Sequence, residues 1–451
     1  MSLPSTEGAP PRPAALPTAT LALLSFVMPL ATDLYLPAFP AMADDLGTDA
    51  SGVQLTLTAF LFGVAAGQLV LGPLSDRLGR RKPILAGAAV CAVGTALCAM
   101  APSLGVLIVL RFVTGFSGAA GLVVGRAVVS DVASGAVAAR LFGVLTTLGG
   151  IAPIAAPLAG GAVVTHAGGW RGAFWVLAVA TLLMFLAALF FVPESLPEER
   201  RRPGGGSTLR AACAVLGDRA YVGYTLAFSF ACGALFCYIA GSAFLLQNVL
   251  GFTVGQASLA FSLGALTATL SSAVGTRLVG RYHPRLLLRA GLTVLLAATT
   301  AALLVTLSGR LGRAAALGLI GLAFLGIGQV FGTATALALE RVPQAAGTGS
   351  AVLGTLQSLL GGIAAPLVGL GGAHTAVPLF AGMALCSLLA VLALLLTRGA
   401  SGSSGGNRDG SGGGRGVGGA QGTEGLVPDR PEQHRLDMPF ARALPGAQQP
   451  G

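Results

Sequence analysis

One stretch of the sequence indicates the fold class of the whole chain: Gly72-Pro73-Leu74-Ser75-Asp76-Arg77-Leu78-Gly79-Arg80-Arg81-Lys82. It places one acid, four cations and two glycines in eleven residues, between two long apolar runs. Over the whole chain only 10% of the residues are charged. A dense charged segment between hydrophobic runs is typical of a short loop at a membrane surface, and its cations predict that the loop faces the cytoplasm.

The composition favours a membrane protein. Hydrophobic residues make up 54% of the 451 residues, and the mean hydropathy is +0.80. Soluble domains are about 25% charged, so this chain has too few charges to solvate a globule of its size. The net charge of +10 lies mostly in loops between apolar runs, which favours membrane topology over nucleic-acid binding. The six cysteines form no CxxC pair, so we expect neither a metal site nor a disulfide framework.

Twelve apolar stretches of about 20 residues, the length that crosses a bilayer, can be marked along the chain. They are residues 17–40, 53–74, 83–101, 104–129, 141–164, 170–192, 221–249, 254–279, 286–307, 313–339, 350–371 and 377–396. A polar segment after the sixth divides them into two sets of six. The sequence therefore predicts an all-α polytopic membrane protein with five parts: a cytoplasmic N-terminal segment (1–16), a six-helix bundle (17–192), a cytoplasmic central loop (193–219), a second six-helix bundle (220–397) and a disordered cytoplasmic tail (398–451).

The cations set the orientation. If the N-terminus is cytoplasmic, the loops on that side carry sixteen lysine or arginine residues and the loops on the other side carry three. This imbalance predicts that both termini are cytoplasmic.

A weak internal repeat relates the two halves. The segment Asp76-Arg77-Leu78-Gly79-Arg80 follows the second span, and the similar segment Thr276-Arg277-Leu278-Val279-Gly280-Arg281 follows the eighth. The second copy lacks the acid and has one extra residue. Its position is the one expected for duplicated halves.

The charged loop also resembles the signature loop of the major facilitator superfamily. The pattern is complete here in Gly72, Leu74, Asp76, Arg77, Gly79, Arg80, Arg81 and Lys82. The resemblance implies two six-helix bundles around a central cavity. It also implies that the loop is a conformational latch, in which Asp76 lies near the N-terminus of the eleventh span. The alternative is a solvated loop that only sets topology.

Arg111 lies within the fourth span, in a segment that resembles the fourth-helix motif of the same family, although Thr114 stands where that motif has glutamine. A cation inside a span costs at least about 2.5–3.5 kcal/mol unless it is paired or hydrated. The resemblance implies a cation that faces the cavity and helps to couple protonation to transport. The alternative is a side chain that snorkels to the membrane surface.

The fifth span resembles the family's antiporter motif. The matching residues are Gly149, Gly150, Pro153, Pro157, Gly160 and Gly161, with Ala152 where glycine often stands and a shifted second proline. Glycine and proline permit close helix approach and a bend. The motif implies export rather than uptake, whereas the alternative is ordinary glycine-rich packing.

Asp33 is the only acid well inside any predicted span. An ionised carboxylate is costly there, and such residues mark proton relays in membrane proteins. We therefore predict that Asp33 carries the proton. The alternative is an acid near the outer mouth, solvated together with Asp44 and Asp45.

Further segments narrow the resemblance to the Bcr/CflA drug-resistance branch, which includes bicyclomycin and chloramphenicol exporters. They are residues 31–40, 54–60, 125–131 and 169–175. The branch implies an inner charge cluster of Arg80 with Asp131. It also implies a monomer in the bacterial cytoplasmic membrane.

Polar and aromatic residues within the spans are candidates for lining the substrate cavity, although packing or lipid-facing roles fit them equally well. They are Tyr35, Gln68, Phe236, Tyr238, Gln329 and Gln357.

The leading hypothesis is a proton-coupled exporter of a small drug, driven by the proton motive force without a cofactor. The alternative with the same fold is an importer or exporter of a small metabolite. A membrane enzyme is disfavoured because no acids, bases or metal ligands converge, and no GxxxxGK[ST] motif for ATP is present.

Overall fold

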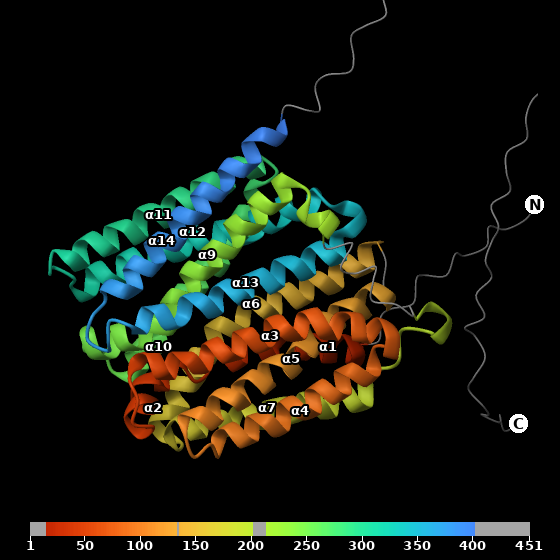
Figure 1. Ribbon diagram of the computed structural model, residues 1–451, viewed down its shortest axis with the longest axis horizontal. Coiled ribbons are helices and arrows are strands. Elements are labelled where there is room, and N and C mark those ends of the chain that lie inside the picture. Colours follow the sequence, from red (N-terminus) through yellow and green to blue (C-terminus); the bar gives the residue numbers. More distant parts are fainter. Residues whose placement is uncertain (1–14, 133–134, 202–212, 402–451) are drawn as a thin grey trace, which may run out of the picture. The chain divides into compact units, whose positions relative to one another are not determined.

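The computed structural model describes residues 15–132, 135–201 and 213–401, and within these ranges the chain forms helices and no strand (Figure 1). The first six long helices are α1 (Ala15–Asp33), α3 (Ala50–Leu78), α4 (Arg81–Ala99), α5 (Leu104–Val132), α6 (Gly135–His166) and α7 (Gly169–Phe191). The second six are α9 (Arg219–Phe244), α10 (Val254–Leu278), α11 (Pro284–Leu307), α12 (Arg313–Glu340), α13 (Ala346–Gly369) and α14 (Val377–Ala393).

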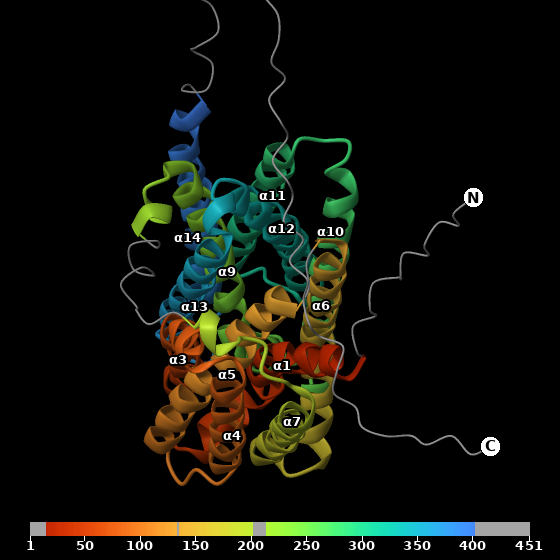
Figure 2. The ribbon, with the colours of Figure 1, turned by 90° about the vertical axis from the view of Figure 1, so that its right-hand side faces the viewer.

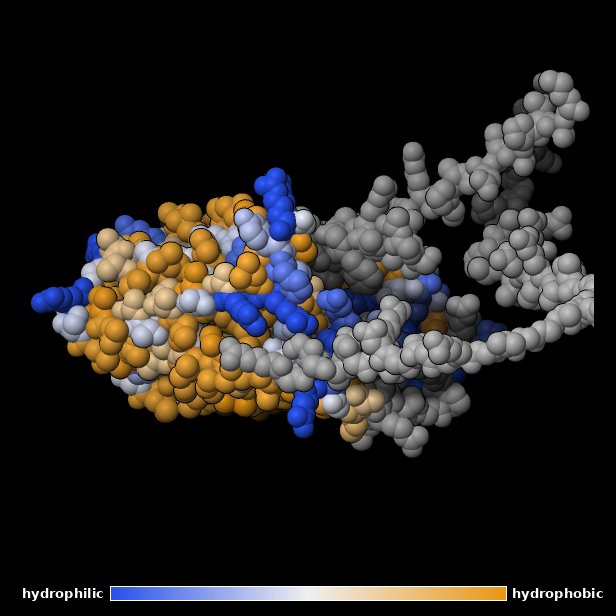
Figure 3. All heavy atoms as spheres, turned by 90° about the horizontal axis from the view of Figure 1, so that it is seen from above, coloured by the Kyte–Doolittle hydropathy of each residue, from blue (hydrophilic) through white to orange (hydrophobic). Residues whose placement is uncertain are grey.

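The length and surface of these helices suit a bilayer. Among the described residues, ten helices are long and apolar enough to cross a membrane, and α1 and α6 complete the twelve that the sequence predicts. Large apolar side chains stand in the open, such as Phe190 at 74% and Leu370 at 75% exposure. Figure 3 shows hydrophobic side chains covering most of the face drawn. Soluble monomers rarely expose such a surface, so lipid covers it. The predicted polytopic helical fold is confirmed.

The long helices pack mainly within two sets, α1 to α7 and α9 to α14. The principal contacts between the sets are α3 against α13 and α6 against α10 (Figure 2). The described residues up to Ser401 nevertheless group as one unit, so the predicted division into two bundles stays a prediction. Residues 1–14 of the predicted N-terminal segment, residues 202–212 of the central loop and the tail from residue 402 lie outside the described residues.

The first span is shorter than predicted. Helix α1 ends at Asp33 and is followed by a 3₁₀ turn, Leu36–Ala38, and a short helix, α2 (Phe39–Asp45). The cause is Pro37, whose ring would collide with the carbonyl four residues earlier, that of Asp33, if the helix continued. Asp33 is therefore the last residue of α1, and the predicted continuous span 17–40 is interrupted after it. Asp33 and Leu34 to Leu36 are buried, so the position of Asp33 within the membrane stays a prediction.

We refer to the two ends of the helical assembly as the loop end and the far end. The loop end is the one at which α3 meets α4 through Gly79 and Arg80. The connection between α10 and α11 lies at the same end, because the number of long helices between the two connections is even. The far end is the opposite one, where α1 leads into α2.

Candidate functional site

Arg80 organises a charged cluster at the loop end. Its side chain is nearly buried, at 8% exposure. It donates to Asp76 Oδ1 at 2.6 Å and to Asp131 Oδ2 at 2.9 Å, and its Nη1 also donates to Ser75 Oγ at 2.7 Å. These bonds tie α3 and α5 to the start of α4. The predicted partners Arg80 and Asp131 are therefore in contact.

Glu194, just after α7, is a member of this cluster that the sequence reasoning missed. Its carboxylate accepts hydrogen bonds from the backbone N–H groups of Arg80 at 2.8 Å and Arg81 at 3.2 Å. Burial alone would raise the pKa of Glu194, but hydrogen bonds from the N–H groups of Arg80, Leu196 and Arg81 outweigh it and hold that pKa below its usual value. The available signal was an acid directly after the sixth span, on the same membrane side as the cationic loop.

Gly79 makes room for that carboxylate. Its φ of +87° lies in the left-handed region that favours glycine. A Cβ at this position would overlap the carboxylate of Glu194. The glycine of the signature loop is therefore needed both for the turn and for the approach of Glu194.

The other members of the signature loop are more exposed. Arg77 faces outward, and Arg81 Nη2 donates to the carbonyl oxygen of Leu189 at 3.0 Å. Gly72 faces Val123 on α5. Asp76, whose side chain is 45% exposed, pairs with Arg80, and no bond from Asp76 to α13 occurs among the described residues. Helices α3 and α13 nevertheless pack along each other, so the predicted position of Asp76 near the start of the eleventh span stays a prediction.

Arg111 on α5 lies in an aromatic cage. Its guanidinium carbon lies 4.2 Å from the ring centre of Phe60, 4.6 Å from that of Tyr35 and 5.7 Å from that of Phe174. The side chain is only 1% exposed, so Arg111 does not snorkel. Within the described ranges, no carboxylate oxygen lies within 4.0 Å of it. Aromatic faces offset part of the cost of burying this cation.

The side chain of Arg111 forms hydrogen bonds to residues on both sides of Asp33 in the chain. Its Nη2 donates to the carbonyl oxygen of Ala31 at 3.0 Å and to the hydroxyl of Tyr35 at 3.2 Å. Asp33 lies between these two residues in the chain and is the only buried acid in the part of the chain that the structure describes. The two predicted proton-coupling residues are thus joined through one short segment, without an ion pair between them.

The antiporter motif in α6 lies against the same segment. A Cβ at Gly160 would overlap the carbonyl oxygen of Leu34, the residue after Asp33. A Cβ at Gly161 would overlap the side chain of Ser258 on α10. The two glycines therefore let α6 touch the end of α1 on one side and α10 on the other.

The prolines of α6 accompany further bonds to α10. Proline lacks an N–H, so Pro153 and Pro157 leave the carbonyls of Gly149 and Pro153 without their helical donors. At the next carbonyl in each case, Thr269 Oγ1 donates to Gly150 at 3.4 Å and Ser262 Oγ donates to Ile154 at 2.7 Å. The motif residues thus lie along the surface where α6 of the first set contacts α10 of the second.

Polar contacts between the two sets are found at the far end and along the middle of the helices. At the far end, Gln247 Nε2, just after α9, donates to the carbonyl oxygen of Pro37 at 2.9 Å. On α3, Gln54 Nε2 donates to the carbonyl oxygen of Ala240 at 3.0 Å. At the loop end the charged pairs stay within one set each: Arg80 with its acids, and Arg341 with Asp218 at 2.9 Å. The described hydrogen bonds therefore join the two sets at the far end.

The six candidate cavity residues do not form one wall. Tyr35 is buried in the cage of Arg111. Tyr238 packs edge-on to Phe261 and Phe324, and its hydroxyl has no hydrogen-bond partner in the described part. Gln329 Nε2 donates to the carbonyl oxygen of Ser271 at 2.6 Å.

The remaining three candidates gather on α13. Gln68 of α3 accepts from Thr355 Oγ1 at 3.4 Å, and the ring of Phe236 of α9 lies against Gly361. Gln357 is itself a half-buried residue of α13. Helix α13 is therefore the place where the predicted lining residues come closest to one another.

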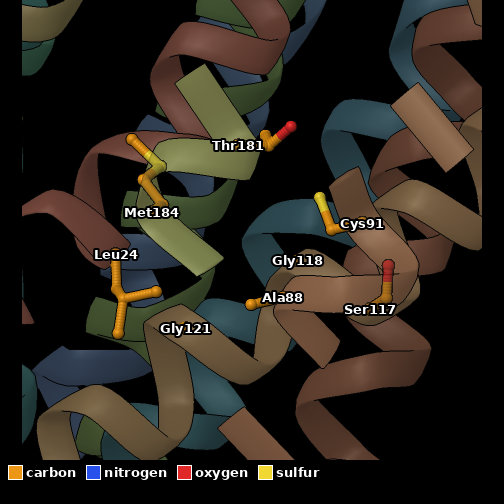
Figure 4. Close-up of a pocket in the computed structure, with 8 residues that line it drawn as sticks. All are labelled: Leu24, Ala88, Cys91, Ser117, Gly118, Gly121, Thr181 and Met184. Carbon is orange, nitrogen blue, oxygen red and sulfur yellow. The ribbon is translucent and has the colours of Figure 1, made fainter. Parts of the chain in front are cut away.

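A pocket lies inside the first set of helices, between α1, α4, α5 and α7. Its walls include Leu24 and Met184 on one side and Cys91 and Ser117 on the other (Figure 4). No charged side chain lines it, and neither Asp33 nor Arg111 belongs to its lining. It is distinct from the central cavity that the sequence predicts.

The motifs and the helical fold are shared with a known protein family. Residues 21–366 match the model of the Major Facilitator Superfamily. The chain belongs to this superfamily. It is therefore a membrane transporter and not an enzyme.

Several bacterial members of the superfamily are similar over most of their length. The chain is 37% identical over 372 residues to the MFS-type transporter YdgK of Bacillus subtilis, covering 82% of this chain and 92% of that one. It is 32% identical over 374 residues to the bicyclomycin resistance protein homolog of Haemophilus influenzae, covering 82% and 93%. It is also 32% identical to a chloramphenicol resistance protein of Pseudomonas aeruginosa, covering 80% and 86%. The resemblance to drug-resistance transporters is confirmed.

Solved structures of this superfamily share the fold. A bacterial homolog of the human lysosomal transporter Spinster has a TM-score of 0.66 at 17% identity, covering 86% of this chain and 96% of that one. The nucleoside transporter NupG has a TM-score of 0.66 at 14% identity, covering 84% and 99%. At these identities the likeness concerns the fold alone.

Proposed function

We propose that this transporter exports small, partly hydrophobic antibiotics across the bacterial cytoplasmic membrane in exchange for protons. Relatives named for bicyclomycin and chloramphenicol resistance support the substrate class. The transporter works as a monomer with both termini in the cytoplasm, and its two six-helix bundles rock around a central cavity.

The observation that carries the proposal is the contact of Gly160 and Gly161 with two different partners. Gly160 lies against the carbonyl of Leu34, next to Asp33, and Gly161 lies against Ser258 of α10. A change in the charge of Asp33 at the end of α1 therefore reaches the contact between the bundles through two adjacent residues of α6. This arrangement supports coupling between protonation and rocking.

Asp33 carries the proton and Arg111 positions the segment that holds it. Arg111 binds the chain on both sides of Asp33, through Ala31 and Tyr35. Asp33 is buried and forms no ion pair among the described residues. A buried acid without a fixed counter-ion suits a carboxyl that gains and loses a proton in each cycle.

The energy available is sufficient for efflux. One proton that moves down a membrane potential of about 100 mV supplies about 2.3 kcal/mol. That corresponds to roughly 50-fold accumulation of an uncharged drug outside the cell, before any contribution from a pH gradient.

The loop-end cluster acts as the conformational latch. In this conformation the two sets are joined at the far end and Asp76 pairs with Arg80. When the loop end closes, Asp76 moves to the N-terminus of α13, where the helix dipole favours a negative charge. Asp76→Asn then slows cycling without changing which drugs are recognised.

A drug-susceptibility panel in an efflux-deficient bacterial host tests the proposed function. The panel includes chloramphenicol-like and bicyclomycin-like compounds, with Asp33→Asn as the inactive form and Arg310→Gln, an exposed cation outside every motif, as the control. We expect resistance to at least one class with the native protein and the control, and none with Asp33→Asn. Equal resistance in all three strains would exclude Asp33, and no resistance to any class would favour a metabolite as the substrate.

A further inference from the structure

The connection between α10 and α11 presents four arginines at the loop end. Arg277 lies in the last turn of α10, Arg281 in the connection, and Arg285 and Arg289 in the first two turns of α11. All four are exposed. Throughout the described residues, none of their guanidinium groups forms an ion pair. We call these four residues the arginine hairpin.

The arginine hairpin is also flanked by exposed apolar side chains. Val279 is 43% exposed, Tyr282 is 52% exposed and Leu286 is 55% exposed. Arg285 and Arg289 lie one turn apart on the same face of α11, about 5–6 Å from each other at Cβ. Unpaired cations next to apolar side chains form a surface that matches both parts of a lipid, the charged headgroup and the start of its chains.

No acid pairs with the arginines of the hairpin in the part of the chain that the structure describes. Thr276 stands where the first half has Asp76, and its hydroxyl donates to the carbonyl oxygen of Ala273 in its own helix. The acids at the same end of the second set are Asp218, which pairs with Arg341, and the exposed Glu340 at the end of α12. The hairpin therefore keeps a charge of four at the boundary between the lipid-facing surface and water.

We propose that the arginine hairpin binds the headgroup of an anionic phospholipid in the adjoining leaflet. The phosphate accepts charge-assisted hydrogen bonds from Arg285 and Arg289, while the chains lie over Tyr282 and Leu286. A soluble anion would use the cations but would gain nothing from the apolar side chains. This inference is independent of the transported substrate.

Quenching of a local tryptophan by brominated lipids tests the inference. The reporter is full-length Tyr282→Trp, corrected for native Trp170 and Trp175 with the parent protein. Vesicles of phosphatidylcholine contain either brominated phosphatidylglycerol or brominated phosphatidylcholine. We expect the anionic lipid to be preferred at this reporter on the order of tenfold, since each cation near an anionic surface contributes severalfold.

The decisive variant adds Arg285→Gln and Arg289→Gln to the reporter, and we expect the preference to fall to about twofold or less. The matched control adds Lys82→Gln and Arg219→Gln, two exposed cations at the same end, and we expect it to keep the preference. If the decisive variant does not fold, Thr276→Asp supplies a counter-charge without removing an arginine, and we expect a reduced preference.

Three results would overturn the inference. One is equal quenching by both lipids at the Tyr282→Trp reporter. Another is the same loss of preference in the control as in the decisive variant. The last is displacement of the lipid by millimolar inorganic phosphate or by a soluble acidic peptide, which would assign the hairpin to a soluble anion or to a protein partner.

Discussion

The α3–α4 hairpin and the α10–α11 hairpin occupy matching positions in the two halves of the chain, but their arginines differ in burial and in ion pairing. In the first, Arg80 is nearly buried and contacts Asp76 and Asp131. In the second, the matching Arg281 is exposed and forms no ion pair in the described part of the chain. The two copies of the repeated pattern therefore occupy the same place in the fold. The copy with acidic partners buries its arginine, whereas the copy without them leaves its arginine exposed.

The sharpest way to break this comparison is to remove the matching cations. Arg80→Gln removes two charge-assisted hydrogen bonds, and it costs about 1–3 kcal/mol because the side chains of Asp76 and Asp131 are partly exposed. We expect a large fall in the apparent melting temperature of the detergent-purified protein. Arg281→Gln removes an exposed cation and should change that temperature little. Similar losses for both variants would contradict the comparison.

The matching glycines provide the next test. Gly79 has a φ of +87° and faces the carboxylate of Glu194, whereas Gly280 has no positive φ and a Cβ there would meet only the carbonyl oxygen of Arg277, at 3.9 Å. Gly79→Ala should cost about 1–2 kcal/mol from backbone strain, in addition to displacing Glu194. Gly280→Ala should be close to neutral. Thermal unfolding of both variants measures this, and an equally tolerated Gly79→Ala would refute the stated role of Gly79.

The smallest expected effect concerns Glu194, and it depends on pH. The pKa of Glu194 in the folded protein lies below its ordinary value of 4.5, so the stability that it contributes is fully present above pH 4.5. That stability is lost as the pH falls through the lowered folded pKa. At neutral pH we expect Glu194→Gln to cost about 1 kcal/mol, because the site is partly exposed.

Melting curves of the native protein and Glu194→Gln, recorded from pH 7 downward, should converge in acid. A difference that persists unchanged below the folded pKa would show that the carboxylate charge is not responsible.

The sequence was sufficient to predict the membrane class, the twelve spans and the signature loop, because lipid forces long apolar runs into helices. It was insufficient for the first span, where the effect of Pro37 on the carbonyl of Asp33 was overlooked. The signal was present but not decisive, since a proline weakens a helix at the carbonyl four residues before it, yet Pro29, Pro153 and Pro157 lie inside helices of this chain. The division into bundles rests on the repeat and on the central loop.

The site was harder to predict than the fold. The motifs predict the contact between Arg80 and Asp131. Glu194 instead binds backbone N–H groups, which leave no complementary charge pattern in the sequence. The faces of Gln68 and Tyr238 were also not predictable. A helix that is apolar on all sides has no polar stripe, so periodicity does not show which side faces the other half.

The central claim is that Asp33 couples drug movement to proton movement. Its most direct test is a measurement of internal pH in sealed proteoliposomes, with the purified transporter and an imposed gradient of a drug that the susceptibility panel identifies. We predict that the drug gradient drives a proton flux in the opposite direction with the native protein and none with Asp33→Asn. A drug-driven proton flux of native size in Asp33→Asn would contradict the claim.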